Sequence, residues 1–236
     1  MKNYSKFLFY VFLFFITNPL ISYSSTIIIN SPEDTYIEGS TISGNNNNTY
    51  GSSAFLNAYT NSHLWGNSLI KFPNLFGSNP NQIPLNATIL TAELHLWLDI
   101  SWGNENNTLS LYQLITDWDE NSVSSNSFGK VTPTLNALAL PVDTLQGPSQ
   151  IIYTDEKFVF NVKGSVENWF TQGNNFGWGL TSTGPQNQFF SSENPNIQRQ
   201  PTLVINYSTV PEPATMILFG LSILGIAGIR KNKILK

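Results

Sequence analysis

The sequence predicts an all-β protein, an antiparallel β-sandwich with one short helix, flanked by an apolar segment at each end. Composition is the first reason. Aromatic residues make up 13% of the chain and charged residues only 11%, and Asn, Ser, Thr and Gly are abundant, which favours strands joined by turn-rich loops. Periodicity is the second reason, because strand-like runs recur between turn signals. A hydrophobic content of 41% argues against a disordered chain.

Residues 90–100 form the clearest predicted strand. Apolar side chains from Leu90 to Ile100 alternate with Thr, Glu, His, Trp and Asp, so one face is buried and the other meets water. One clean alternating face is typical of an antiparallel sandwich. The other predicted strands are 26–30, 54–59, 68–72, 109–115, 157–162, 176–182, 188–192 and 202–207.

The short helix is predicted just before the strand at 176–182. Val166, Trp169 and Phe170 have helical i, i+3, i+4 spacing, and Gly173 is placed to end the helix. Residues 122–150 show no regular pattern, so we expect a long loop that crosses an end of the sandwich.

Residues 1–24 are predicted to be a secretory signal peptide. Lys2 and Lys6 precede an apolar run at 7–16, and small residues lead up to Ser24. This pattern predicts that signal peptidase cleaves after Ser24. An uncleaved membrane anchor is the alternative.

The predicted domain, residues 25–209, is acidic and contains no cysteine. Its length of about 185 residues suits one domain with a sizeable core. Its 14 acidic and 5 basic side chains give a formal charge of −9, so no nucleic-acid partner is expected. Without cysteine, the fold depends on its core rather than on disulfides.

Residues 210–236 form the second apolar segment. Pro211, Glu212 and Pro213 give a stiff, extended start, because each proline fixes its own φ and restricts the residue before it. Residues 214–229 carry no charge and predict a single transmembrane helix, although about 20 residues normally cross a bilayer. The basic tail, 230–236, contains Arg230, Lys231 and Lys233, which belong on the cytoplasmic side.

This order of motif, apolar helix and basic tail resembles a PEP-CTERM sorting signal. In that family the signal is read by an exosortase, a membrane transpeptidase-like protease of Gram-negative bacteria that make exopolysaccharide. The resemblance implies export, a transient stay in the inner membrane, processing near residues 211–213 and delivery to the cell surface or extracellular matrix. An ordinary C-terminal anchor is the alternative.

The predicted domain also carries short motifs in a fixed order. They are Asp34-Thr35-Tyr36, Asn48-Thr49-Tyr50-Gly51-Ser52-Ser53, Ser68-Leu69-Ile70-Lys71-Phe72, Ala87-Thr88-Ile89, Ala92-Glu93-Leu94, Trp118-Asp119-Glu120, Phe160-Asn161-Val162 and Gln200-Pro201-Thr202-Leu203-Val204-Ile205. Together they resemble a DNRLRE-type domain, which implies a jelly-roll β-sandwich related to carbohydrate-binding modules of the alginate-binding kind and to disaggregatase-associated domains. Lys71, where the family often has Arg, and Ser124, where a Thr-Trp pair is frequent, depart from that pattern.

Calcium is the metal that the sequence favours, because it takes carboxylate, carbonyl and amide oxygens from irregular loops. Jelly-roll modules of the kind that the domain resembles often hold a structural calcium ion. The candidate donors are Asp34, Asp119 and Glu120, with solvated turn residues as the alternative. A chain without cysteine or a paired-histidine spacing gives no support for a zinc site.

Aromatic residues are the best candidates for sugar binding, because an aromatic face stacks on the apolar side of a pyranose ring. Trp118, Trp169 and Trp178 are expected to pack in the core or at its rim. We expect Trp97, Trp102 and Tyr112 to build a binding platform. The alternative is that one of these residues simply covers the edge of the sandwich.

No catalytic residue is predicted. The two histidines, His63 and His95, lie in no recognisable nucleophile setting, and no carboxylate pair is placed for glycoside hydrolysis. We therefore expect a secreted, surface-sorted, non-catalytic module of the exopolysaccharide or biofilm matrix, which binds extracellular polysaccharide or has a structural role. The alternative is a polysaccharide-active enzyme, a lyase or glycoside hydrolase, with an unrecognised site.

Overall fold

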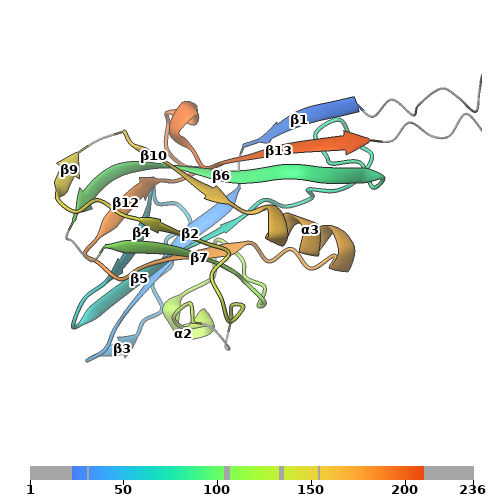
Figure 1. Ribbon diagram of the computed structural model, residues 1–236. Coiled ribbons are helices and arrows are strands. Elements are labelled where there is room, and N and C mark those ends of the chain that lie inside the picture. The colour runs from blue at the N-terminus through green and yellow to red at the C-terminus, as the bar shows by residue number, and fades with distance from the viewer. Residues whose placement is uncertain (1–22, 31, 104–106, 133–135, 154, 210–236) are drawn as a thin grey trace, which may run out of the picture. The chain divides into compact units, whose positions relative to one another are not determined.

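The computed structural model describes residues 23–209 apart from 31, 104–106, 133–135 and 154 (Figure 1). Residues 26–85 and 89–207 form one compact unit, and the rest of the chain is assigned to a second. The predicted transmembrane helix, the basic tail and residues 1–22 of the predicted signal peptide lie outside the described residues. All the sites described below lie in the larger unit.

Thirteen strands form one sheet, and the strand pairs of known register are antiparallel. The strands are β1 (Tyr23–Ile29), β2 (Glu33–Ser40), β3 (Gly44–Asn45), β4 (Phe55–Thr60), β5 (Leu64–Lys71), β6 (Ala87–Trp102), β7 (Thr108–Gln113), β8 (Asp143–Gln146), β9 (Ile151–Tyr153), β10 (Lys157–Asn161), β11 (Trp178–Ser182), β12 (Asn187–Phe190) and β13 (Thr202–Thr209). The prediction of a mostly-β, antiparallel architecture is confirmed.

The long strand β6 is the centre of one half of this sheet (Figure 1). β10 and β9 pair with it in succession, with Lys157 opposite Trp97 and Ile151 opposite Trp102, while β12 and β13 are its other neighbours. The burial pattern follows the predicted alternation, since Leu94, Leu96 and Leu98 are fully buried. The clearest expectation from periodicity is therefore confirmed.

Strand β4 joins the two halves of the sheet. It pairs with β12 on one side and with β5 on the other, so the hydrogen-bonded path continues from β6 round to β5, β11, β7 and β8. The result is a single, strongly curled sheet of half-barrel form. Its inner core includes Phe160, Trp169 and Trp178, each at most 1% exposed.

A second apolar cluster lies on the other face of β2 and β5. Its buried members are Ile37, Trp65, Leu69, Leu114, Trp118, Val123, Val131 and Ala137, with Tyr112, Phe128 and Phe176 packed against them. Three of its eight buried members, Val123, Val131 and Ala137, come from the segment that the sequence predicts to be a loop, as does Phe128. That segment therefore covers an outer face of the sheet and also contributes β8.

The structure contains more helix than the single short one predicted. α3 (Lys163–Gln172) matches the prediction: Val166 and Trp169 are buried, and Gly173 ends the helix with φ of 80°. A second helix, α2 (Ser125–Phe128), and the 3-10 turn η1 (Ile197–Arg199) were not predicted. α2 has only four residues, which is too short for an apolar periodicity to be detected. Its start is stabilised by a capping box at Ser124.

None of these described helices is long and apolar enough to cross a membrane.

A buried polar network ties the loops at one end of the sheet. Asn107 and Asn187 are fully buried and form a reciprocal amide pair, with N···O distances of 2.9 and 3.0 Å. Ser182 donates to the Asn107 amide oxygen at 3.0 Å, and Ser101 donates to that of Asn187 at 2.8 Å. Buried polar groups that are fully hydrogen-bonded in this way specify one arrangement of the loops they join.

Candidate functional site

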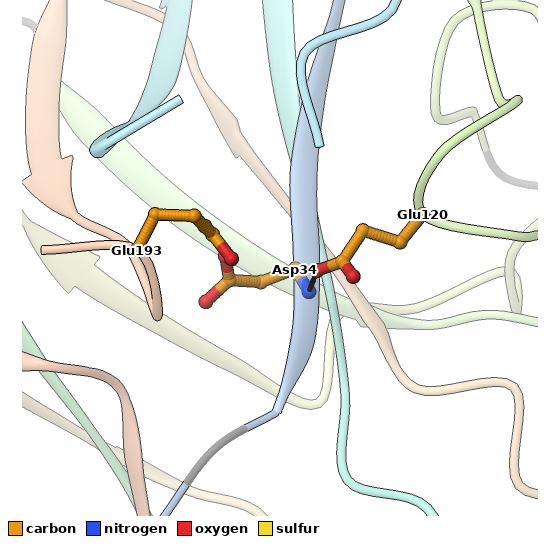
Figure 2. A group of neighbouring side chains, drawn as sticks. All are labelled: Asp34, Glu120 and Glu193. Atoms are coloured by element: carbon orange, nitrogen blue, oxygen red, sulfur yellow. Dashed lines mark hydrogen bonds between the residues drawn. The ribbon is translucent and has the colours of Figure 1, made fainter. Parts of the chain in front are cut away.

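Three carboxyl groups meet at the start of strand β2 (Figure 2). Asp34 comes from β2, Glu120 from the turn after Trp118, and Glu193 from the turn after β12. Each offers one oxygen, and these three oxygens lie within 4.8 Å of one another. We refer to Asp34, Glu120 and Glu193 as the acidic cluster.

Asp34 is the fixed centre of the acidic cluster, because its carboxylate is fully buried. The backbone N–H of Ser192 donates to Asp34 Oδ2 at 2.9 Å, and the Ser192 hydroxyl lies 3.2 Å from Asp34 Oδ1. The backbone N–H of Asp34 donates to Glu120 Oε1 at 2.7 Å, the contact drawn in Figure 2. Three segments of the chain are thus joined through one aspartate.

Burial and like charge both oppose ionisation in the acidic cluster. Burial raises the pKa of Asp34 well above its ordinary value of 3.8, and the neighbouring Glu193 and Glu120 raise it further, against the hydrogen bonds from Ser192. Burial also raises the pKa of Glu120. The cluster is therefore suited to hold either a proton or a cation.

No basic side chain of the described residues forms an ion pair with the acidic cluster. Lys71, which lies opposite Glu33 in the β2–β5 register, pairs with Glu33 at 2.8 Å and with Asp117 at 3.4 Å, and Arg199 pairs with Asp155. Two oxygens bound to the same Ca²⁺ lie at most about 5 Å apart, since each bond is roughly 2.3–2.6 Å. The spacing and the hard oxygen donors of the cluster fit such an ion.

Two of the three predicted metal ligands are brought together here. Asp34 and Glu120 belong to the acidic cluster, but Asp119 is exposed and accepts a hydrogen bond from Ser122 at 2.8 Å. Glu193 was missed. It lies far along the chain, and only the return of β12 beside β4 carries it to Asp34, so no local pattern could have identified it.

The predicted platform residues lie on two different strands. Trp97 and Trp102 belong to β6: Trp97 is half-buried with the Lys157 ammonium 5.9 Å from its ring centre, and Trp102 is 41% exposed. Tyr112 belongs to β7 and packs against the outer apolar cluster. No ring contact between Tyr112 and either tryptophan occurs in the described part of the chain.

A different tyrosine lies beside Trp102. β9 pairs with the end of β6, so that Ile151 is opposite Trp102 and Tyr153 is opposite Ile100. Tyr153 is 78% exposed and Ile151 is 60% exposed. We refer to Trp102, Ile151 and Tyr153 as the aromatic strip. The sequence did not suggest Tyr153, because a strand of three residues has too little pattern to detect.

Comparison with known protein families finds a PEP-CTERM protein-sorting motif at residues 209–231. The match contains Pro211, Glu212 and Pro213 as well as Arg230 and Lys231, and Lys233 follows it. No curated protein matches the chain.

The chain is thus an exported protein with a mostly-β, antiparallel, curled sheet and a sorting motif at its C-terminal end. The motif implies that an exosortase processes this protein and that a bacterium sorts it to the cell surface.

Replacing Asp34 by Asn should change how stability depends on pH. The raised pKa means that the folded protein holds this proton more tightly than the unfolded chain. The associated stabilisation is complete below about pH 3.8 and is lost as the pH rises through the folded-state pKa. We expect the free energy of urea unfolding of the wild type, measured with a chelator present, to fall as the pH rises through this range. The free energy of unfolding of Asp34→Asn should fall less. Parallel pH profiles for the two proteins would contradict this assignment.

Proposed function

We propose that this protein is a non-catalytic component of the bacterial exopolysaccharide or biofilm matrix, which binds carbohydrate or has a structural role there. The sorting motif carries the proposal, because it implies delivery to the surface where such a matrix is assembled. The antiparallel sheet is compatible with a jelly-roll module of the DNRLRE type, and that finer assignment is part of the proposal.

The aromatic strip supports carbohydrate binding by its chemistry. Trp102 and Tyr153 are exposed aromatic side chains on neighbouring strands, and aromatic rings stack on the apolar side of a sugar ring. Trp97 remains a candidate on the same strand as Trp102. Tyr112 is the weakest member of the predicted platform, because its ring already packs against the outer apolar cluster.

Removing the two rings of the strip should weaken polysaccharide retention. We expect Trp102→Ala and Tyr153→Ala each to reduce affinity about fivefold, since one stacked ring contributes about 1 kcal/mol. Retention of the full-length protein on immobilised host exopolysaccharide measures the effect. Leu85→Ala is the matched control, because Leu85 is 73% exposed and lies outside the strip.

Unchanged retention of a folded double variant would reject the strip as the binding platform. Product analysis of the same polysaccharide after incubation tests the non-catalytic part of the proposal. Release of shorter chains or of unsaturated ends would favour a hydrolase or a lyase instead.

Calcium at the acidic cluster is a further part of the proposal, supported by three converging carboxylates without a basic partner among the described residues. We expect Ca²⁺ at about 100 times its Kd to raise the Tm by roughly 5–10 °C, from about 2.7 kcal/mol of binding free energy. Asp34→Asn and Glu120→Gln should abolish the rise. Asp119→Asn is the control and should retain it, because Asp119 lies outside the cluster. An equal rise in all four proteins would point to unspecific binding.

The sorting motif itself can be tested with Pro211→Ala combined with Pro213→Ala. We expect a folded protein that stays in the membrane fraction, because the extended segment that the exosortase reads is lost. Immunoblotting of membrane, surface and medium fractions measures the change, with Pro80→Ala as the control. Normal release of the double variant would contradict exosortase sorting without bearing on carbohydrate binding.

A further inference from the structure

A groove runs between α3 and the segment that leads into β8. It consists of two adjoining hollows of about 160 and 510 Å³. Gln113, Leu138 and Asn168 line both hollows, which makes them one continuous feature. The groove shares no residue with the aromatic strip or with the acidic cluster. We refer to it as the α3 groove.

Two buried polar groups in the walls of the α3 groove have no hydrogen-bond partner in the described part of the chain. They are the Ser165 hydroxyl and the Trp169 indole N–H. Ser165 is 2% exposed and Trp169 is 1% exposed. The two residues stand one turn apart on α3.

Unpartnered buried polar groups are rare in folded proteins, because each loses its hydrogen bonds to water without replacement. Among the described residues, two of the four such groups, those of Ser165 and Trp169, belong to the lining of this groove. A ligand that offers hydroxyl groups would satisfy both, since hydroxyls both donate and accept.

The charge of the groove points to a neutral ligand. None of the residues lining either hollow is acidic, although the predicted domain has a formal charge of −9. The lining contains one basic side chain, Lys163, whose ammonium lies 3.6 Å from Glu167. The remaining polar lining is mostly amide: Gln113, Asn161, Asn168, Gln172 and Asn174.

The segment that leads into β8 gives the groove an apolar, exposed part of its lining. Leu138 is 41% exposed and Leu140 is 77% exposed, and Pro141 lies beside them. A lining that combines amides with exposed aliphatic side chains matches a sugar ring, whose hydroxyls point outward and whose C–H groups form an apolar face.

We propose that the α3 groove binds a neutral oligosaccharide, with Gln113, Ser165, Asn168 and Trp169 holding its hydroxyls and Leu138 and Leu140 covering its apolar face. This proposal goes beyond the proposed function, because it places a second, separate carbohydrate site on the protein. The aromatic strip would then hold polymer at the surface, while the groove selects one sugar unit.

Calorimetric titration of the full-length protein with neutral hexasaccharides of glucose, mannose, galactose and xylose tests the groove. We expect one of the four to bind with one-to-one stoichiometry. Asn168→Ala should weaken that binding about three- to tenfold, because one hydrogen bond to the ligand is lost. Asn81→Ala, at an exposed asparagine outside the groove, is the matched control and should leave it unchanged.

A spectroscopic readout keeps the test independent of folding defects. The indole N–H resonance of Trp169, assigned with Trp169→Phe, should shift when the bound hexasaccharide is added to the wild type. If Trp102→Ala abolishes binding and Asn168→Ala does not, the proposed groove site is wrong and the aromatic strip is supported instead. No binding of any neutral hexasaccharide, or binding of oligouronates alone, would also overturn it.

Discussion

The fold depends on the pairing of β6 along both of its edges. Leu94, Leu96 and Leu98 are fully buried on this strand, and four other strands find their register against it. β12 also pairs with β4, and β4 pairs with β5, so the sheet continues without a break. These strand pairings position both the aromatic strip and the acidic cluster, because Trp102 ends β6 and Glu193 follows β12.

Hydrogen-bonded polar groups take over the role that disulfides have in many exported proteins. The chain has no cysteine, yet the amide pair of Asn107 and Asn187 and the contact of Asp34 with Ser192 each connect distant segments inside the protein. The two differ in their chemistry. The amide pair is neutral and satisfied, whereas Asp34 carries a carboxyl whose burial and acidic neighbours favour a proton or a cation. Polar groups thus connect distant segments at both places, but only the acidic cluster has the chemistry to hold a proton or a cation.

The sequence predicted those elements that have strong local patterns. β6 and α3 follow from apolar periodicity, and residues 209–231 carry a sorting motif that is read directly from its order. β2 was missed because its buried positions include Asp34 and Thr35 on opposite faces of the strand, and the burial of these polar residues depends on partners far along the chain. Two of the three members of the acidic cluster, Asp34 and Glu120, were named from the sequence. Glu193 was missed because it meets them only through tertiary pairing, and Asp119, the neighbour of Glu120 in sequence, lies outside the cluster.

The contact between Asp34 and Ser192 also bears on when the protein can fold. The two residues are separated by 158 positions, and β12, the strand before Ser192, completes the path between β6 and β4. Contacts of such long range slow folding, since most of the chain must be present before they form. An exported chain crosses the membrane with its N-terminal end first. Its first strands therefore cannot complete their pairing until the last strands have crossed. Ser192 lies shortly before the sorting motif in the sequence. The contact between Asp34 and Ser192 can therefore form only near the end of translocation, so the last step of folding coincides with the export of the sorting motif.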